Sequence, residues 1–214
     1  MKRNKFGLAV LVAAASLTAG AQAQETATAI FAGGCFWSIE SDFDHAPGVL
    51  DTTSGYIGGH VDNPTYEEVT TETTGHREAV KVTFDPKVTS YAKLLDAYWH
   101  MTDPTSADGQ FCDFGDSYRP GLFPLDQTQF DEATKSKDDI AKTLGKPVAT
   151  TIQMAPTFYP AEAYHQNFWQ GTDQFAAGYT RAQWYQQYRT GCGKNAKVAA
   201  LWGNAAFEGL NGHE

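Results

Sequence analysis

Two neighbouring stretches near the start of the chain carry clear hydrophobic patterns. Residues 29–32 form a short apolar run that ends at Gly33 and Gly34, which predicts a buried strand followed by a turn. Apolar side chains then recur every three or four positions over residues 36–43, which predicts a helix with one buried face. Cys35 is therefore expected at the first turn of this helix, directly behind the glycine pair.

A second strand is predicted by strict alternation. Over residues 79–85 every second side chain is apolar, while Lys81 and Thr83 fill the positions between them. This pattern is typical of a strand with one face on the core and one face in water. By the same parity, Glu78 is expected on the apolar side of the strand.

The rest of the chain predicts further helices and strands. We expect a turn-rich segment at 48–59, a short capped helix at 63–68, a helix from Ser90 to about Thr102, a helix over 130–144 closed by Gly145, a strand at 151–154 and a short helix at 161–169. Beyond about Thr190 the chain is rich in small residues and is expected to be irregular. Strands that alternate with helices favour one two-layer α/β or α+β domain over residues 24–214.

The first 23 residues have a different pattern. A cationic start over residues 1–5 precedes an uncharged apolar stretch over 6–20, and residues 21–23, Ala-Gln-Ala, match the small residues that signal peptidases require. The apolar stretch is shorter than the roughly 20 residues that a membrane-spanning helix needs. We therefore expect a cleaved secretory signal over 1–23, not an anchor, and a periplasmic or secreted mature protein in an oxidising compartment.

Composition narrows the class of function. The 214 residues include 16 Lys and Arg against 25 Asp and Glu, a formal net charge of −9. A chain with this charge lacks the basic field that nucleic-acid binding requires. The three cysteines, Cys35, Cys112 and Cys192, contain no Cys-x-x-Cys pair and no zinc-ligand spacing. We therefore expect neither nucleic-acid binding nor a metal site.

Cys35 is the first candidate for chemistry. A thiol at the N-terminus of a helix faces unpaired backbone N–H groups and the positive end of the helix dipole, and both favour the nucleophilic thiolate. The alternative is an inert buried cysteine, a common role for a free thiol. The local sequence leaves both interpretations open.

Glu78 is the second candidate. A carboxyl on the apolar face of a strand is desolvated, so its pKa rises and it can donate a proton near neutral pH. The alternative is a glutamate at the end of a strand that turns out to water.

Five segments carry a further pattern when they are taken together. They are Gly33-Gly34-Cys35-Phe36-Trp37, Gly55-Tyr56-Ile57-Gly58-Gly59, Asn63-Pro64-Thr65-Tyr66, Thr74-Gly75-His76-Arg77-Glu78-Ala79-Val80 and Ala161-Glu162-Ala163-Tyr164-His165-Gln166. In this order they resemble the A class of peptide methionine sulfoxide reductases, and the resemblance extends from about Thr28 to Trp202. It implies a ferredoxin-like α+β sandwich, with helices covering a mixed sheet and a long irregular C-terminal segment.

The resemblance also implies an activity and the residues that carry it. The expected reaction is reduction of methionine S-sulfoxide, free or in oxidised proteins, as repair of oxidative damage. Cys35 is the implied nucleophile, and Glu78 the acid that protonates the sulfoxide oxygen. The other implied residues are Phe36 and Trp37 around the S-methyl group, Tyr66 and Tyr118 on the oxygen, Asp113 near them, and His165 at the substrate pocket.

A second thiol completes the implied reaction, because attack leaves a sulfenic acid that a thiol can convert to a disulfide. Residues 188–193 with 201–203 resemble the resolving block of some family members. The implied pair is therefore Cys35–Cys192, with glycines beside Cys192 giving it reach. An external thioredoxin-like dithiol is the implied reductant, no cofactor or metal is expected, and we expect a monomer.

The sequence departs from the family pattern at three places. Ser38 and Thr102 replace a common glycine and histidine, and residues 110–113, Gln-Phe-Cys-Asp, replace Gln-Gly-Asn-Asp. Cys112 thus lies next to an implied site residue. We expect it to be a buried structural thiol, with a part in the redox chemistry as the alternative.

Two other functions would use the same residues. A two-cysteine peroxide reductase would need Cys35 and Cys192 but no methyl pocket. A secreted binding module would hold the same two cysteines in a permanent disulfide, worth roughly 4–5 kcal/mol across so long a loop. Turnover of methionine sulfoxide or of peroxide separates the first from the leading interpretation, and an unreactive disulfide identifies the second.

Overall fold

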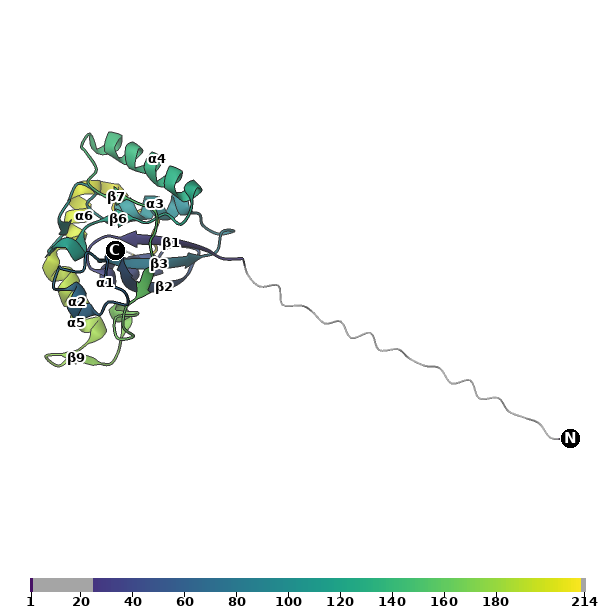
Figure 1. Cartoon of the computed structure of the whole chain (residues 1–214), viewed down its shortest axis with the longest axis horizontal. Helices are drawn as coiled ribbons and strands as arrows, with labels where there is room; N and C mark the ends of the chain where they lie inside the picture. Colours follow the sequence, from purple (N-terminus) through teal and green to yellow (C-terminus); the bar gives the residue numbers. More distant parts are fainter. Residues whose placement is uncertain (2–24, 213–214) are drawn as a thin grey trace.

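The computed structural model describes Met1 and residues 25–212 (Figure 1). The expected signal segment thus lies outside the described residues, except for Met1. Within the described part of the chain, no helix combines the length and the apolar character needed to cross a membrane.

Strands and helices alternate in the first half of the chain, and helices dominate its end. The strands are β1 (Ala27–Ala32), β2 (Val49–Ile57), β3 (Arg77–Phe84), β4 (Gly109–Gln110), β5 (Asp113–Phe114), β6 (Gly121–Leu122), β7 (Thr151–Ile152), β8 (Phe158–Pro160), β9 (Gln174–Ala176) and β10 (Tyr179–Thr180). The α-helices are α1 (Phe36–Asp44), α2 (Tyr66–Val69), α3 (Tyr91–His100), α4 (Gln127–Leu144), α5 (Arg181–Cys192) and α6 (Lys194–Trp202). Short 3₁₀ helices lie at Asp116–Tyr118, Phe168–Gln170 and Gly203–Ala205.

Six strands form the main sheet, in the order β7-β6-β1-β3-β2-β8. Neighbouring strands are antiparallel except β6 and β7, which are parallel. In the register of the central strands, Phe31 lies opposite Val80, and Tyr56 lies opposite Glu78. The mixed sheet and its helices confirm the expected α+β class.

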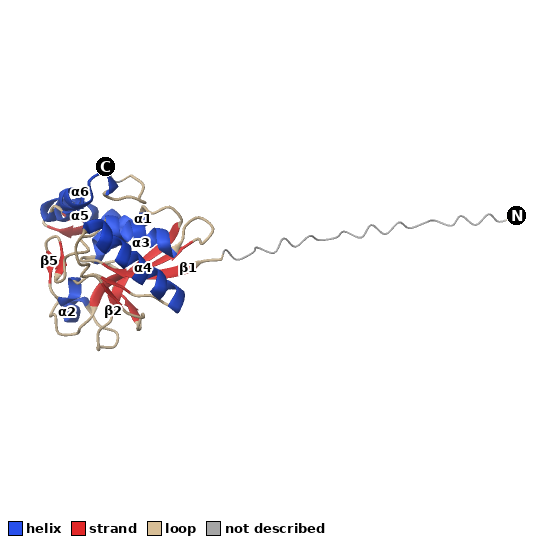
Figure 2. Cartoon of the chain, turned by 90° about the horizontal axis from the view of Figure 1, so that it is seen from above, coloured by secondary structure: helices blue, strands red, loops and turns tan. Residues whose placement is uncertain are grey.

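The main core lies between this sheet and the helices α1 and α3. Val80, Val82 and Phe84 of β3 join the apolar faces of α1 and α3 in one buried cluster. α4 packs outside α3, where the Trp99 indole donates a hydrogen bond to Ser136, and Figure 2 shows α1, α3 and α4 gathered over the strands. The parity predicted for β3 is confirmed.

The topology brings the candidate chemistry to one end of the sheet. Because β1 and β3 are antiparallel, the end of β1 and the beginning of β3 are adjacent. Cys35 follows β1, and Glu78 is the second residue of β3. The helices α5 and α6 lie at this same end of the molecule (Figure 1).

Two expectations about the middle of the chain are wrong. Residues 49–57, expected as turns, form the strand β2. Its backbone pairs with β3 on one side and, over residues 55–57, with β8 on the other. These hydrogen bonds outweigh the threonines and the glycine that suggested a loop. Residues 161–169, expected as a helix, form turns that lead into the 3₁₀ helix Phe168–Gln170. Asn167 has a φ of 51°, which a right-handed helix does not accept.

The end of the chain also differs from the expectation of a long irregular segment. Residues from 153 to 180 contain little regular structure, but α5 and α6 follow them. Gly193 ends α5 with a φ of 68° and begins α6, so one glycine in the left-handed region joins two helices. The glycines that suggested irregular structure here act as a helix cap.

Candidate functional site

Cys35 lies at the junction of β1 and α1. It is the N-cap residue of α1, and its carbonyl accepts the Ser38 N–H at 3.0 Å. Gly34 has a φ of 85°, and a Cβ at this position would lie 2.6 Å from the Cβ of Gln110. The turn that presents Cys35 therefore requires glycine. The thiol is free, and the residue is 9% exposed.

Burial dominates the electrostatics of the Cys35 thiol. Desolvation raises the pKa of the thiol well above its usual value, and the negative charges of Glu78 and Asp113 raise it further. A hydrogen bond with the Tyr188 hydroxyl lowers it only in part. The expected thiolate is thus not favoured in this state, because desolvation outweighs the helix dipole.

Glu78 is buried beside the start of α1. Its Oε2 accepts the Phe36 N–H at 2.8 Å, and the residue is 2% exposed. Desolvation raises the pKa of the carboxyl to about 8, although the Phe36 N–H lowers it in part. At neutral pH Glu78 therefore carries a proton that it can donate, as its parity on the strand predicts.

Two tyrosines complete the polar side of the site. The hydroxyls of Tyr66, at the start of α2, and Tyr118 interact with each other, and both lie close enough to Glu78 and Cys35 for ionisation of either group to raise the pKa of the phenols. Burial is the largest cause that raises the pKa of each phenol. Both hydroxyls are therefore hydrogen-bond donors at neutral pH. The structure brings these two tyrosines and Asp113 together around Cys35, as the sequence predicts.

The other side of the site is aromatic. The rings of Phe36 and His165 have centroids 4.9 Å apart, and Trp37 stacks on Phe168 at 3.7 Å. The Trp37 indole N–H donates to Nδ1 of His165 at 3.1 Å. Since Nδ1 accepts, the imidazole carries its proton on Nε2. Phe36, Trp37 and His165 thus form one connected wall next to Cys35.

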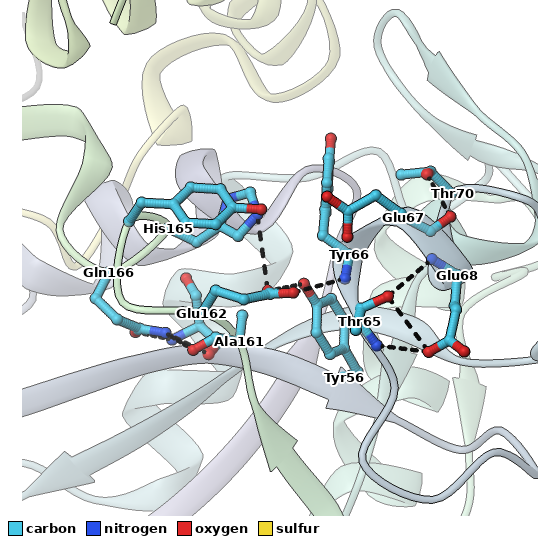
Figure 3. Close-up of polar contacts among 12 residues, drawn as sticks. Tyr56, Thr65, Tyr66, Glu67, Glu68, Thr70, Ala161, Glu162, His165 and Gln166 are labelled. Carbon is cyan, nitrogen blue, oxygen red and sulfur yellow. Dashed lines mark hydrogen bonds and ion pairs between the residues drawn. The ribbon is translucent and has the colours of Figure 1, made fainter. Parts of the chain in front are cut away.

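Glu162 ties the wall to α2. Its carboxylate accepts the Tyr66 N–H at 2.8 Å and the Tyr56 hydroxyl at 2.8 Å (Figure 3). His165 Nε2 lies 4.0 Å from the same carboxylate. Desolvation lowers the pKa of His165 to about 4, so the imidazole is neutral at pH 7. Glu162, which the sequence analysis assigned no role, positions residues on both sides of the site.

The structure pairs the other two cysteines with each other. Cys112 and Cys192 form a disulfide with their Cα atoms 5.0 Å apart. Cys112 is exposed in the two-residue loop between Gln110 and Asp113, which pair across the β4–β5 hairpin. The expectation of a buried structural thiol at Cys112 is therefore wrong, since the unpredicted hairpin carries it to the surface. The implied Cys35–Cys192 bond, proposed also as a permanent staple, is not the bond present in this state.

Two further features were missed by the sequence analysis. Tyr188 donates a hydrogen bond to Asp113 and lies against Cys35. Asp42 of α1 is fully buried, forms an ion pair with Arg189 at 2.8 Å and accepts a hydrogen bond from Lys194 at 2.5 Å, which fixes α5 and α6 to α1. Helical spacing between residues 185, 188 and 192 could have revealed the inward face of α5, but its partners are remote in sequence.

One set of residues in the described part of the chain has metal-ligand geometry: Cys112, Asp113 and Cys192. The two sulfurs are bonded to each other, so in this state they offer no pair of thiolates to a metal.

The arrangement suits a defined kind of chemistry. A buried thiol lies beside a protonated carboxyl and two phenols, so an oxygen can be protonated while the atom that bears it is attacked by sulfur. The Cys112–Cys192 disulfide supplies a second redox pair. The fold and this site define a thiol-dependent oxidoreductase.

Comparison with known proteins gives the family. The model of the peptide methionine sulfoxide reductase family matches residues 27–197, and the chain belongs to this family. It is 46% identical over 191 residues to peptide methionine sulfoxide reductase MsrA 2 of Rhizobium meliloti, covering 89% of this chain and 91% of the relative. It is 54% identical over 144 residues to MsrA of Ligilactobacillus salivarius, covering 66% and 84%.

Solved structures agree. The reduced form of Mxr1 from Saccharomyces cerevisiae matches with a TM-score of 0.66 and 29% identity, covering 75% of this chain and 94% of that one. Methionine sulfoxide reductase A of Corynebacterium diphtheriae matches with a TM-score of 0.65 and 28% identity, covering 74% and 84%. The expected family, fold and enzyme class are confirmed.

Proposed function

We propose that this chain reduces methionine S-sulfoxide to methionine, with Cys35 as the nucleophile and Glu78 as the acid. The observation that carries the proposal is the hydrogen bond from the Phe36 N–H to Glu78. This hydrogen bond holds the protonated Glu78 carboxyl next to Phe36, the residue that directly follows Cys35. Family membership supports the choice of a sulfoxide as the substrate.

The first step transfers the sulfoxide oxygen to the enzyme. The oxygen accepts a proton from Glu78 and hydrogen bonds from Tyr66 and Tyr118, which makes the sulfur electrophilic. Cys35 sulfur attacks, and the thiol proton replaces the one that Glu78 gave. The products are methionine and a sulfenic acid on Cys35, so sulfur of the substrate is reduced and sulfur of Cys35 is oxidised. The aromatic wall holds the S-methyl group.

Two thiol exchanges follow. The Cys192 thiol condenses with the Cys35 sulfenic acid to form a Cys35–Cys192 disulfide and water. The Cys112 thiolate then attacks the Cys192 sulfur, which releases Cys35 as a thiol and forms the disulfide seen here. Because Cys112 is exposed and the other two cysteines are 9% exposed, this second exchange brings the disulfide to the surface. An external thioredoxin-like dithiol attacks there and returns two electrons.

Mass spectrometry tests the cycle directly. Fully reduced protein receives one equivalent of methionine S-sulfoxide without reductant, and both methionine and disulfide linkages are measured. We expect one methionine and a Cys112–Cys192 linkage for the wild type. Cys112→Ser should stop at Cys35–Cys192, and Cys192→Ser should stop at a Cys35 sulfenic acid that a 1,3-dione traps. A Cys35–Cys112 linkage in the wild type would overturn the order of the exchanges.

Substrate choice has its own test. Methionine R-sulfoxide and hydrogen peroxide are supplied in parallel at the same concentration. The proposal requires turnover of the S epimer to exceed both. Faster turnover of peroxide would favour the two-cysteine peroxide reductase instead.

The site of action is also a proposal. Residues 1–23 have the pattern of a secretory signal, so we propose that the mature chain acts in the periplasm or outside the cell, as a monomer, on oxidised proteins there. N-terminal sequencing of the protein from fractionated cells should give a start at Gln24. Size-exclusion chromatography with light scattering checks the monomer.

A further inference from the structure

Tyr188 occupies the space in front of the Cys35 thiol. Its hydroxyl interacts with the thiol and donates a hydrogen bond to Asp113. Its ring meets Trp37 edge to face, with centroids 6.2 Å apart and an interplanar angle of 86°. Tyr188 therefore covers the thiol and touches the wall proposed to hold the S-methyl group. With this side chain in place, Cys35 is 9% exposed, which leaves little room for a sulfoxide.

The position of Tyr188 is linked to the disulfide. Tyr188 and Cys192 are four residues apart on α5, so they lie on one face of the helix, one turn apart. Their partners, Asp113 and Cys112, are adjacent in the β4–β5 hairpin. The hydrogen bond and the disulfide are thus two neighbouring links between the same two elements.

A closed site is useful in this redox state. Once Cys112 and Cys192 are bonded, Cys35 is again a free thiol, but the chain contains no other cysteine that could resolve it. A second sulfoxide would leave a sulfenic acid on Cys35, which further oxidation converts irreversibly to higher acids.

We propose that Tyr188 is a redox-coupled gate: the Cys112–Cys192 disulfide holds it over Cys35, and reduction of this disulfide opens the site to substrate. This inference rests on the proposed function, because a closed site protects Cys35 only if the enzyme reacts with a sulfoxide. Reduction proceeds by attack of one thiolate of an external dithiol on Cys112, which releases Cys192 as a thiolate. The second thiol of the reductant then displaces Cys112, so the reductant leaves as a disulfide and the enzyme gains two electrons and two protons.

The fold allows a local opening. Arg189 and Lys194 attach α5 and α6 to buried Asp42, and neither ion pair involves the hairpin or the disulfide. Once the disulfide is broken, the hairpin is held to the helices by the Tyr188 hydrogen bond, by one from Lys197 to the Phe111 carbonyl, and by the contact of Lys194 with the Phe111 ring. Reduction therefore frees the hairpin, and with it Asp113, the partner that holds the Tyr188 hydroxyl.

Alkylation of Cys35 tests the gate without any turnover. In the disulfide form Cys35 is the one free thiol, so its modification by iodoacetamide is read directly by mass spectrometry. We expect at least about tenfold faster modification at Cys35 in oxidised Tyr188→Ala than in the oxidised wild type, and a similar gain in Cys112→Ser/Cys192→Ser, which has no disulfide. Gln187→Ala, an exposed neighbour on α5, is the matched control and should behave as wild type.

Equal rates of Cys35 modification in the oxidised wild type and in Cys112→Ser/Cys192→Ser would overturn the gate. This comparison does not depend on how Tyr188→Ala folds. Equal rates in wild type and a folded Tyr188→Ala would show that another group covers the thiol. Both results would leave the proposed function intact.

The number of methionines released per chain gives a second test of the gate. With excess methionine sulfoxide and no reductant, the wild type should release one methionine per chain, since the site closes after the second exchange. Tyr188→Ala should release close to two and accumulate a Cys35 sulfenic acid. Two methionines from the wild type would contradict the gate, while no methionine from either protein would contradict the proposed function itself.

Discussion

The nucleophile region and the exchange region use the same element, sulfur, in opposite settings. The nucleophile region comprises the end of β1, the start of α1 and the start of β3, and it buries Cys35 and Glu78 against the main sheet. The exchange region comprises the β4–β5 hairpin and the end of α5, and it exposes Cys112 in the turn between two strands of two residues each. One setting fixes a reacting atom, and the other lets sulfur atoms change partners.

The difference follows from how each region is held. Strand pairing across β1, β3 and β2 fixes the nucleophile region, and paired core strands are generally the most resistant to local opening. In the exchange region, the hairpin is joined to α5 and α6 by a disulfide, by side-chain hydrogen bonds and by the contact of Lys194 with the Phe111 ring. A thiol that attacks a substrate needs accurate positioning, whereas thiols that hand on a disulfide must be able to separate.

Cys35→Ser gives the largest expected effect, because it removes the nucleophile and leaves the exchange region untouched. Serine cannot supply a thiolate at neutral pH, so reduction of methionine sulfoxide should be abolished. The Cys112–Cys192 disulfide should still form on oxidation, and circular dichroism should show a wild-type fold. Appreciable turnover by this variant would refute the assignment of the nucleophile.

Glu78→Gln should slow the sulfoxide step by about 10²–10⁴-fold, the usual contribution of general acid catalysis. The amide keeps the acceptor for the Phe36 N–H but has no acidic proton. Single-turnover formation of methionine isolates this step from the later exchanges. In the wild type the rate should fall as the pH rises through the pKa of Glu78, about 8, because the acid must be protonated. A near wild-type first turnover in the variant would mean that another group supplies the proton.

The sequence predicts the two regions unequally, for physical reasons. Periodicity over residues 29–43 and parity at Glu78 reflect burial against one sheet, and both survive folding because they depend on the local backbone. Tyr66 and Tyr118 required the family resemblance, since a single tyrosine has no periodic signature. The bond between Cys112 and Cys192 spans 80 residues and depends on where a short hairpin meets a helix, which local patterns do not contain.

Asp42→Asn should strongly destabilise the joint between the two regions. Asp42 is 0% exposed and pairs with Arg189 and Lys194, so the amide would leave two buried cations without a counter-charge. Loss of one partner of a buried ion pair typically costs about 3–5 kcal/mol. Urea unfolding measures the change. Asp139→Asn is a matched control, because Asp139 also binds two lysines, Lys135 and Lys142, but on the exposed face of α4, where little change is expected. Equal effects at both positions would show that burial of the cluster contributes nothing.

Glu40→Gln should change stability in the opposite direction, and it tests how tightly the nucleophile region is closed to water. Glu40 is 0% exposed on α1, and desolvation raises the pKa of its carboxyl to about 8, which the backbone of Asn167 offsets only in part.

The unfolded carboxyl ionises near 4.3, so between that pH and about 8 the unfolded state releases a proton that the folded state keeps. The wild type therefore loses stability from this group as the pH rises through this window. Glutamine does not ionise, so the variant should match the wild type near pH 4 and become more stable than the wild type as the pH rises towards 8. The control is Glu132→Gln on the exposed surface of α4, and urea unfolding at several pH values measures both. A stability difference at Glu40 that does not change with pH would mean that water reaches this carboxyl, and that the nucleophile region opens more readily than its strand pairing suggests.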